Sequence, residues 1–581
     1  MSGSEADAVI VGGGWVGGIM AAELTKAGLN VVVLERGPSN GRDTAAFQKD
    51  HDELAYAVRL KLFQDSSVET TTLRHDLQQT AMPLRYFGAF LPGNGWGGAG
   101  IHWNGMTWRF NERDFQIRTY QQQKYGSIPA GVTIQDWGIT YDEMEPYYDK
   151  FEYMSGIAGK AGNLNGEKIP GGNVLEAPRA REYPVPPMPT AHAPGVFQYA
   201  AQKLGYHPFP TPSANLPTAY TNPDGVSRGT CTYCGFCERF GCEVGAKADA
   251  VVTVFPVAQK TGRLDLRFNA NVFKILTTGN QATGVQYYDE QGNVQTQNAG
   301  VVILGAFIFN NVRLLMMSGM GQQYDPITQT GTLGRNYAYQ LSGPGATGYF
   351  KNYTFHRYMG SGSNGIAIDD FYGDNFDHSA LGFMGGGVVS SGASGARPIQ
   401  SMPASKSAGT WGPQWKQSIK QWYDSVMSAG VQGEIIALNW RMLDLDPTYK
   451  DRWGNPLLRI TYDHSDNERK MAAYIGQKCA EIVKAAGADE VEVSDTLPPH
   501  FDVTVYQSTH NTGGAIMGSD PSTSVVNNWL QMWGYQNVWV IGASAFPQNA
   551  GKNPTGTVGA LAYRAADGII NHYLKSPGPL A

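Results

Sequence analysis

The clearest pattern of apolar and polar positions lies in the first 35 residues. Two apolar stretches, ADAVIV at 6–11 and NVVVLE at 30–35, enclose a run of glycines and a segment with helical spacing of its apolar positions. Short apolar runs bounded by turn residues are typical of strands buried on both faces. The pattern therefore predicts a strand, a helix and a second, parallel strand, which together form a βαβ unit.

The turn after the first predicted strand has the glycine spacing G-x-G-x-x-G. We expect Gly12 to form the tight turn, Gly14 to let a pyrophosphate approach the backbone, and Gly17 to let the helix pack closely on the strand. Glu35, at the end of the second strand, is expected to accept hydrogen bonds from a ribose. Chance explains a lone glycine triplet in a chain with 72 glycines, but it does not explain the triplet together with both strands and the acid. The unit predicts dinucleotide binding without deciding between FAD and NAD.

Later segments alternate less regularly. The alternation in EIIALNWRMLDL (434–445) and NPLLRITYD (455–463) predicts strands, and NERKMAAYIGQKCAEIVKAAG (467–487) predicts an amphipathic helix with Cys479 in the core. The longest apolar run, Val301 to Phe309, ends at two asparagines. It falls short of the roughly 18 to 20 residues that span a bilayer, so no membrane span is expected.

Length and charge narrow the function classes. The chain has 581 residues, of which 42% are hydrophobic and 16% charged, and its net charge is −6. This length predicts more than one domain. Nucleic-acid binding is not expected, because no cluster of Lys and Arg is present to displace counterions from phosphate. The start, MSGSEADAVIVGGG, shows neither the basic nor the apolar region of a signal peptide, so we expect any export to use another polypeptide's signal.

Four of the five cysteines lie within residues 229–249. Cys231, Cys234, Cys237 and Cys242 have the spacing C-x2-C-x2-C-x4-C, which is too tight for a framework of disulfides and close to the runs that hold an iron–sulfur cluster. Zinc is the competing interpretation, although zinc sites usually separate two ligand pairs by a longer loop. Four inert thiols are a third interpretation.

Four longer stretches resemble signatures of the glucose-methanol-choline (GMC) family of flavin-dependent alcohol dehydrogenases and oxidases. They are GNGWGGAGIHWNGMTWRFNERDF (93–115), DWGITYDEMEPYYDKFE (136–152), VVILGAFIFNNVRLLMMSGM with LGRNY (301–320 and 333–337), and the C-terminal block from THNTGGAIMG to GALAYRAA (509–566). The resemblance frames the whole chain. It implies that the dinucleotide is FAD.

The same resemblance implies an α/β fold, α+β overall. A Rossmann-like FAD-binding domain is joined to a substrate domain, which has a mainly antiparallel sheet with helices on one side. We expect the FAD domain to be discontinuous and to include the cysteine loop at 229–249. Its expected segments are 1–40, 85–135, 225–340 and 500–581, with connecting or cap segments at 136–224 and the substrate domain at 341–499.

Alcohol oxidation needs a base for the hydroxyl proton and an acceptor for the hydride that leaves the same carbon. The resemblance places the catalytic pair at His510 and Asn553, with the imidazole as base and the amide on the same oxygen, and it implies hydride transfer to flavin N5. Many family members have a second histidine where this chain has Asn553, and other members share the asparagine. Without the family, His510 is one of 11 histidines and a structural role is favoured.

The resemblance also implies flavin contacts in the glycine loop and in the C-terminal block. Pro554 and Thr555 suit a helix start with free backbone N–H groups, although a plain capped helix has the same sequence. His102 leaves two alternatives open, a covalent bond to FAD or a histidine that only stacks on the ring or hydrogen-bonds to it. The full set of expected contacts is Gly97, Gly98, His102, Trp103, Asn104, Ala543, Pro554 and Thr555, in addition to Gly12, Gly14, Gly17 and Glu35.

The cysteine stretch resembles that of a bacterial subgroup of the family, the large subunits of membrane-associated sugar, polyol and sugar-acid dehydrogenases. The subgroup implies a three-iron (3Fe-4S) cluster in preference to a four-iron one. It also implies a multi-haem cytochrome c partner, a small subunit that carries the export signal, and a periplasmic, membrane-associated location. The leading expectation for the reaction is oxidation of gluconate to the 2-keto acid. Arg109 and Lys552 are candidates to meet a carboxylate.

Other functions remain open at this point. Sorbitol, fructose and glucose dehydrogenases of the same subgroup are rivals for the substrate. An oxidase that uses O2 and holds structural zinc at the cysteines is an alternative, and so is a protein that only relays electrons.

Overall fold

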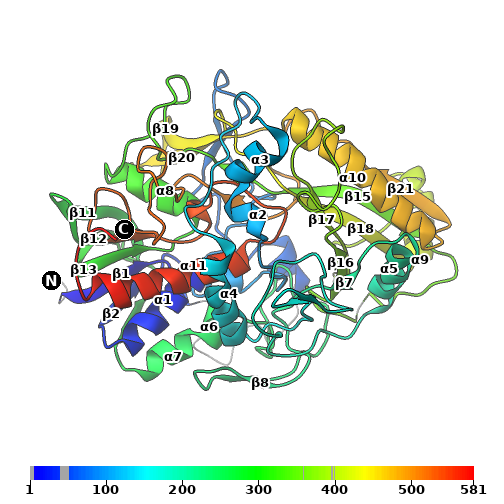
Figure 1. Ribbon diagram of the computed structural model, residues 1–581, viewed down its shortest axis with the longest axis horizontal. Helices are drawn as coiled ribbons and strands as arrows, with labels where there is room; N and C mark the ends of the chain where they lie inside the picture. Colours follow the sequence, from blue (N-terminus) through cyan, green and yellow to red (C-terminus); the bar gives the residue numbers. More distant parts are fainter. Residues whose placement is uncertain (1–4, 40–51, 358, 394–396, 398, 581) are drawn as a thin grey trace.

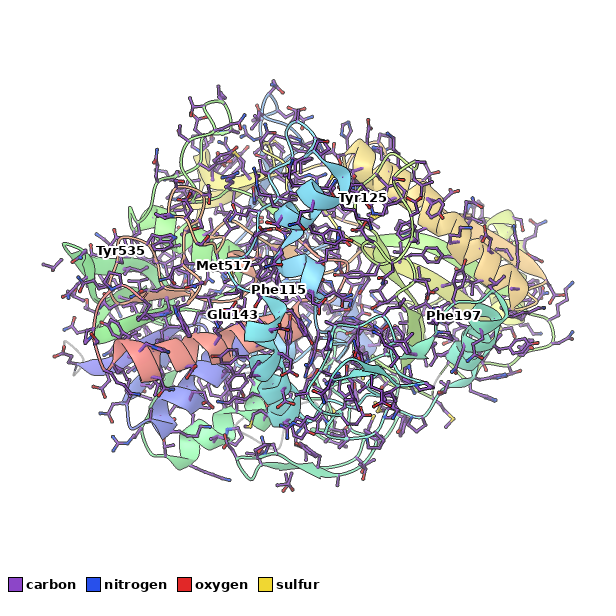
Figure 2. The ribbon with its side chains drawn as sticks, in the orientation of Figure 1. Phe115, Tyr125, Glu143, Phe197, Met517 and Tyr535 are labelled. Carbon is purple, nitrogen blue, oxygen red and sulfur yellow. The ribbon has the colours of Figure 1, made fainter. Side chains whose placement is uncertain are left out.

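A computed structural model describes residues 5–39, 52–357, 359–393, 397 and 399–580 of the chain. Two lobes lie side by side, one around a largely parallel sheet and one around an antiparallel sheet, and both termini lie on the side of the first (Figure 1). Side chains fill the space between the lobes, where Phe115 lies (Figure 2). The Phe115 ring packs 5.1 Å from the ring of Trp137.

The first sheet has seven strands in the order β10-β2-β1-β13-β12-β11, with β23 also paired to β13. The pairs β10/β2, β2/β1, β1/β13 and β13/β23 are parallel, whereas β12 pairs antiparallel with both β13 and β11. The strands are β1 (Ala6–Val11), β2 (Val31–Leu34), β10 (Leu264–Arg267), β11 (Asn271–Thr278), β12 (Gln281–Tyr288), β13 (Val294–Leu304) and β23 (Val538–Val540).

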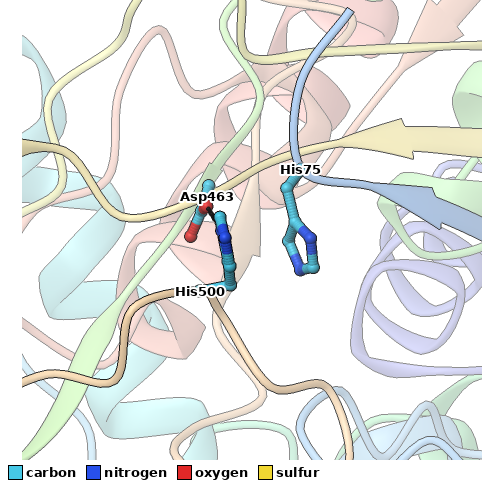
Figure 3. A group of neighbouring side chains, drawn as sticks. All are labelled: His75, Asp463 and His500. Carbon is cyan, nitrogen blue, oxygen red and sulfur yellow. Dashed lines mark hydrogen bonds and ion pairs between the residues drawn. The ribbon is translucent and has the colours of Figure 1, made fainter. Parts of the chain in front are cut away.

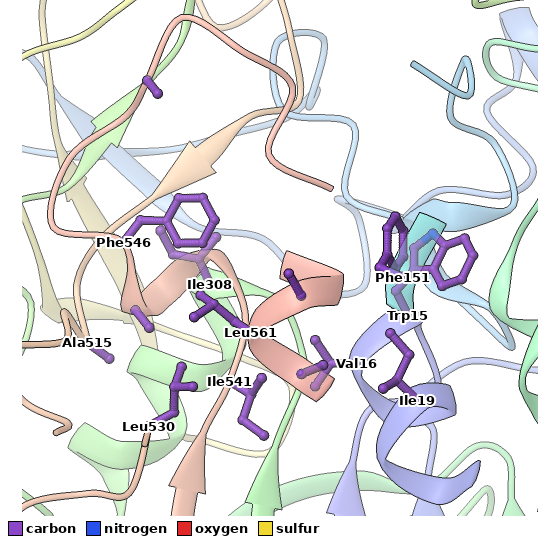
Figure 4. Packing of buried hydrophobic residues seen from close by; sticks show 14 of the residues in the cluster. Trp15, Val16, Ile19, Phe151, Ile308, Ala515, Leu530, Ile541, Phe546 and Leu561 are labelled. Atoms are coloured by element: carbon purple, nitrogen blue, oxygen red, sulfur yellow. The ribbon is translucent and has the colours of Figure 1, made fainter. Parts of the chain in front are cut away.

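The predicted βαβ unit is confirmed. Helix α1 (Trp15–Lys26) joins β1 to β2 and packs against α7 (Phe255–Lys260) and α11 (Thr555–Asp567). Side chains from α1, α8 (Ile308–Met317) and α11 meet in one core cluster, with Val16, Ile308 and Leu561 among them (Figure 4). The stretch 301–320 forms the end of β13 followed by helix α8.

The second large sheet has the order β21-β15-β18-β17-β16-β7, and all neighbouring strands are antiparallel. Helix α10 (Asp466–Ala485) packs across β15 and β18 and against α5 (His192–Lys203), and Cys479 is buried within it as predicted. The strands are β7 (Phe209–Pro210), β15 (Leu341–Tyr349), β16 (Gly365–Ile368), β17 (Gly387–Gly392), β18 (Val426–Gly433) and β21 (Glu490–Ser494).

A four-stranded sheet and several short elements complete the described structure. The sheet is β19 (Met442–Lys450), β20 (Pro456–Thr461), β3 (Thr72–Arg74) and β4 (Met82–Pro83). The other described α-helices are α2 (Glu112–Phe115), α3 (Ile117–Tyr125), α4 (Tyr141–Ser155), α6 (Ala250–Thr253) and α9 (Gly412–Trp422). The short strand pairs are β5 (Asn163–Leu164) with β6 (Glu167–Lys168), β8 (Tyr220–Thr221) with β9 (Ser227–Arg228), and β14 (Ala338–Tyr339) with β22 (Asn511–Thr512).

The strand predicted over 434–445 is wrong in its first part, because β19 begins only at Met442. The backbone of 434–439 bonds to loops instead of to a ladder, as Ile435 N–H donates to Asn549 O and Thr133 N–H donates to Ala437 O. The predicted strand at 455–463 is confirmed as β20. The division into FAD and substrate domains stays a prediction. Strands β3 and β7, from outside 341–499, pair with β20 and β16 from inside it.

Described helices offer no segment that is both long and apolar enough to cross a membrane.

Gly17 is predicted to tolerate no side chain. A Cβ atom there would lie 2.0 Å from the Gly12 carbonyl oxygen, so α1 would have to move away from the turn. We expect Gly17→Ala to lower the free energy of unfolding by about 3 kcal/mol in urea denaturation. Gly195→Ala is the matched control, because this helical glycine of α5 has only an ordinary contact, 3.6 Å from Thr190, and the substitution should stabilise the helix by about 0.5–1 kcal/mol. Equal effects at the two positions would contradict the account.

Candidate active site

A large pocket lies at the carboxyl ends of the parallel strands, where open α/β sheets bind ligands. Its lining is drawn from the turn after β1 and from residues within the segments 91–106, 305–314, 506–511 and 541–558. Twelve residues expected at the cofactor or the catalytic centre line it together: Gly12, Gly14, Glu35, Gly98, His102, Trp103, Asn104, His510, Ala543, Asn553, Pro554 and Thr555.

Two residues expected to contact the cofactor, Gly17 and Gly97, do not line the pocket but pack against residues that do. Gly17 packs α1 on the turn, and the backbone N–H of Gly97 donates to the Gly13 carbonyl at 2.8 Å. Gly97 adopts φ +91°, a left-handed conformation that favours glycine. The two glycines thus shape the pocket without lining it.

Glu35 holds the dinucleotide turn closed. Its carboxylate accepts from the backbone N–H of Gly13 at 2.7 Å and of Gly37 at 2.8 Å, and its burial raises its pKa. Gly12 has φ +103°, and a Cβ on it would lie 2.7 Å from the Gly305 carbonyl oxygen. A Cβ on Gly14 would meet nothing closer than 3.9 Å, so the pocket side of this residue is open for a ligand.

His510 and Asn553 meet in the pocket wall. Asn553 Nδ2 lies 3.2 Å from His510 Nε2, and Trp108 Nε1–H donates to Asn553 Oδ1 at 2.6 Å. His510 Nδ1 lies 2.5 Å from Gln340 Oε1. Burial lowers the pKa of His510 to about 3, so the imidazole is neutral at ordinary pH. A neutral imidazole has a lone pair that can accept a hydroxyl proton.

Helix α11 begins two residues after Asn553. Pro554 is the N-cap and Thr555 is the first helical residue, so the expected helix start is found. A Cβ on Gly556 would lie 2.4 Å from the Trp108 carbonyl oxygen, so the helix start is pressed against the 107–108 backbone. Because Pro554 and Thr555 line the pocket, the positive end of the helix dipole faces it.

His102 is buried in the pocket wall, with 4% of its surface exposed. Its ring packs 4.1 Å from the Phe63 ring, and its Nε2 has no hydrogen-bond partner among the described residues. Burial, helped by the nearby Lys247 ammonium, lowers the pKa of His102 to about 3. An unpartnered, neutral Nε2 fits either a covalent flavin bond or a polar contact with the ring.

The four clustered cysteines are free thiols that interact with one another. Burial raises the pKa of Cys231 to about 12, and the proximity of Cys234, Cys237 and Cys242 adds to the rise. Among described residues, the one group of three metal ligands within 4.8 Å of one another lies elsewhere, so these thiols are spread more widely. Tetrahedral zinc, with Zn–S bonds of about 2.3 Å, would bring the sulfurs to about 3.8 Å.

Three of the sulfurs already face N–H donors. Tyr233 N–H donates to Cys231 Sγ and Lys247 N–H to Cys242 Sγ, both at 3.4 Å. Asn215 Nδ2 donates to Cys237 Sγ at 3.6 Å. Such donors favour thiolates and tune the potential of iron–sulfur clusters.

The cysteine loop and the pocket share a wall. Arg239 N–H donates to His102 O at 2.7 Å, and Trp103 Nε1–H donates to Ala248 O at 2.8 Å. The buried Lys247 ammonium donates both to Trp103 O at 2.6 Å and to Cys237 O at 2.7 Å. The cysteine loop and the pocket wall are therefore in direct contact through these hydrogen bonds.

Comparisons with known proteins agree with this arrangement. Family models described as GMC oxidoreductase match residues 137–341 and 443–562, and a model of NAD(P)-binding Rossmann-like domains matches residues 10–72. The gluconate 2-dehydrogenase flavoprotein of Pantoea cypripedii is 45% identical to this chain, over 99% of the chain and 95% of the relative. The chain belongs to the GMC oxidoreductase family. It is therefore an FAD-dependent oxidoreductase, as the sequence predicted.

More distant GMC relatives extend the comparison. The fructose dehydrogenase large subunit of Gluconobacter japonicus is 26% identical, over 97% of the chain and 98% of the relative. The crystal structure of pyridoxine 4-oxidase from Mesorbium loti matches with a TM-score of 0.61 and 17% identity, over 98% of this chain and all of that one. This last likeness establishes the fold.

Neither cation suggested for a carboxylate lines the pocket of this GMC protein. Arg109 is buried and paired with Glu145 and Glu152, and Lys552 Nζ lies 3.2 Å from Asp369 Oδ2. Both charges are neutralised within the fold.

Sequence reasoning missed Trp108 and Gln340, which contact the His510–Asn553 pair. Trp108 lies inside the 93–115 stretch, and Gln340 follows LGRNY by three residues, so both were adjacent to recognised signatures. Their partners stand 445 and 170 residues away, and no local pattern signals such contacts.

A separate cluster of titratable side chains lies outside the pocket. His500 Nδ1–H donates to Asp463 Oδ2 at 2.6 Å, and the rings of His500 and His75 stack 4.8 Å apart (Figure 3). Asp463 also accepts from Phe501 N–H at 2.8 Å, and His75 Nε2 donates to Phe501 O at 3.0 Å. The cluster ties the ends of β3 and β20 to the loop at 500–501.

His464, next to this cluster, predicts a measurable loss of stability in acid. It is buried, neither ring nitrogen has a partner among the described residues, and burial lowers its pKa from 6.5 to about 4. The unfolded chain takes up a proton below about pH 6.5 and the folded chain only near pH 4, so the free energy of unfolding falls as the pH drops through this window.

Urea denaturation at pH 7 and at pH 5 measures how far the free energy of unfolding falls between the two. We expect this fall to be about 2 kcal/mol smaller in His464→Leu than in the wild-type chain. Between pH 7 and pH 8 the two proteins should change in parallel, because the histidine is neutral in both states. A variant with the pH dependence of the wild-type chain would show that His464 is not the group responsible.

Proposed function

We propose that this chain is the flavoprotein subunit of a dehydrogenase that oxidises a secondary alcohol of a sugar acid, with gluconate to its 2-keto acid as the preferred reaction. The chemistry rests on one observation, the contact between neutral His510 and Asn553 in the pocket that also holds the dinucleotide turn. The choice of substrate rests on the 45% identity to a gluconate 2-dehydrogenase flavoprotein. A sugar substrate is the second candidate, since a fructose dehydrogenase subunit is also similar over the full chain.

His510 Nε2 takes the hydroxyl proton in the proposed reaction. The Nδ2 amide of Asn553, 3.2 Å from that nitrogen, donates a hydrogen bond to the same substrate oxygen and holds it in reach. When bound, FAD supplies the acceptor for the hydride. Gly12, Gly14 and Glu35 hold the dinucleotide end, and the N-terminus of α11 favours negative charge at the other end.

His102 is proposed to attach FAD covalently. Its Nε2 has no partner among the described residues, and the residue lines the pocket. Precipitation with acid should leave the flavin on the wild-type protein and release it from His102→Ala. Release from the wild-type protein would leave His102 a noncovalent contact.

Cys231, Cys234, Cys237 and Cys242 are proposed to hold an iron–sulfur cluster, with three irons preferred over four. The spacing of the four cysteines and the N–H donors on three of their sulfurs support it. When bound, the cluster supplies a one-electron carrier next to the pocket wall. The expected acceptor is a multi-haem cytochrome c subunit, with a small subunit that carries the export signal, in a periplasmic complex at the membrane.

We expect His510→Ala to bind FAD and to slow substrate-driven flavin bleaching by about 10²–10⁴-fold, the usual cost of losing a general base. Stopped-flow absorbance under anaerobic conditions measures it. His207→Ala is the control, because His207 is exposed, pairs with Asp370 and lies outside the pocket lining. Bleaching of His510→Ala at the wild-type rate would refute the proposed base.

Cys234→Ser separates the two half-reactions. We expect it to lose iron and acid-labile sulfide and to reduce added cytochrome c poorly, while substrate still bleaches its flavin. Cys479→Ala is the matched control, since this fifth cysteine lies in the core of α10 and should keep full iron. Full cytochrome reduction by a Cys234→Ser protein that has lost its iron would end the relay proposal.

A further inference from the structure

The position of one proton on His510 decides what the residue can do. An imidazole acts as a base only at the nitrogen that carries no hydrogen, and the hydrogen bond at the other nitrogen sets which one that is. In His510 both ring nitrogens have a side-chain amide as neighbour, Asn553 at Nε2 and Gln340 at Nδ1. An amide offers either an oxygen or an NH2 group, so each amide must be oriented by its own neighbours.

Asn553 is oriented by a tryptophan. Trp108 Nε1–H can only donate, and it lies 2.6 Å from one arm of the Asn553 amide, so that arm is the oxygen. The other arm, 3.2 Å from His510 Nε2, is therefore the NH2 group. It donates to His510, which requires a lone pair at Nε2.

Gln340 is oriented from the opposite end by two backbone carbonyls. One arm of its amide lies 2.8 Å from Ala550 O and 2.9 Å from Lys552 O, and because carbonyls only accept, this arm is the NH2 group. The other arm is the oxygen, 2.5 Å from His510 Nδ1. An oxygen there requires a hydrogen on Nδ1. The Asn553 side and the Gln340 side therefore both indicate the same tautomer of His510.

Gln340 also joins the segments that carry the pair. It is fully buried between β14, which pairs with β22 directly after His510, and β15 of the antiparallel sheet. Its backbone N–H donates to His510 O at 3.2 Å, and its side chain binds Ala550 and Lys552, just before Asn553. It does not line the pocket, so it acts through other residues.

We propose that Gln340 is a positioning residue that fixes His510 as the Nδ1–H tautomer and thereby leaves Nε2 as the base that faces the pocket. The inference rests on the proposed function, in which His510 takes the substrate proton. It goes further in naming a side chain outside the pocket that, together with Asn553, sets the direction of proton transfer. An amide does so without adding a charge beside the imidazole.

The direct test is nitrogen NMR of the FAD-loaded protein labelled with ¹⁵N-histidine, with His510 assigned from its loss in His510→Gln. We expect a protonated Nδ1 and an unprotonated Nε2 in the wild-type protein. A protonated Nε2, or an even mixture of tautomers, would overturn the proposal with no variant needed at position 340.

Gln340→Met keeps the length of the side chain and removes both hydrogen-bonding groups. We expect part of the His510 population to shift to the Nε2–H tautomer, because Asn553 alone then favours the Nδ1–H form. We expect kcat to fall by about 10-fold because the Nε2–H form cannot accept the proton, and KM to change little because the residue is outside the pocket. Gln135→Met is the matched control, since this buried glutamine donates to Met517 O and lies away from the pocket lining, and it should keep the tautomer and the rate.

The outcomes separate the two claims. Should Gln340→Met fold, bind FAD and keep both the single tautomer and the wild-type kcat, Gln340 is not the positioning residue even though His510→Ala is inactive. Should His510→Ala itself react at the wild-type rate, the proposed function fails whatever the tautomer is.

Discussion

The close approach of three backbone segments at the carboxyl ends of the parallel strands is the constraint on which the rest of the structure depends. A Cβ on Gly12 would lie 2.7 Å from Gly305 O, and a Cβ on Gly17 would lie 2.0 Å from Gly12 O. Leu304 pairs in register with the end of β1 and with Val540, so the turns after all three strands emerge at one edge. The dinucleotide turn, the 305–314 segment and the C-terminal block are held together there, and the pocket is the space between them.

The pocket and the cysteine loop next to it differ in their electrostatic environment. His510 is half-buried, and desolvation lowers its pKa, which keeps a neutral imidazole in the pocket. Behind the wall, burial raises the pKa of the Cys237 thiol, and the Lys247 ammonium, which donates to Cys237 O, opposes that rise. The pocket that contains the proposed base and the cysteine loop proposed to hold an electron carrier are therefore neighbours, joined by hydrogen bonds. Lys247 itself donates to both sides, at Trp103 O and Cys237 O.

The sequence was informative where chemistry is carried by residues close together in the chain. The strand–turn–helix of residues 6–26 and the cysteine spacing are local patterns, and the structure has both the βαβ unit and a loop of interacting thiols. The family resemblance supplied His510 and Asn553, which the structure brings into contact. Gln340 and Trp108 could not be found in this way, because their roles depend on partners more than 100 residues away.

Contacts between residues far apart in the chain also explain the predictions from sequence that were wrong. Alternation over 434–445 predicted a strand, but the backbone of 434–439 finds its hydrogen bonds in loops that the sequence does not place beside it. Arg109 and Lys552 looked available for a carboxylate, because their buried acidic partners cannot be read from spacing. In each case the deciding contact is tertiary, and the local pattern is compatible with more than one structure.

The central claim is that this GMC protein passes electrons onward through an iron–sulfur cluster at its cysteine loop. Iron, zinc and acid-labile sulfide content of the as-purified protein, together with its low-temperature EPR spectrum, tests it most directly. The account predicts about three irons per chain with matching sulfide and an EPR signal from the oxidised cluster. Zinc without sulfide would contradict it and would make the cysteines a structural site.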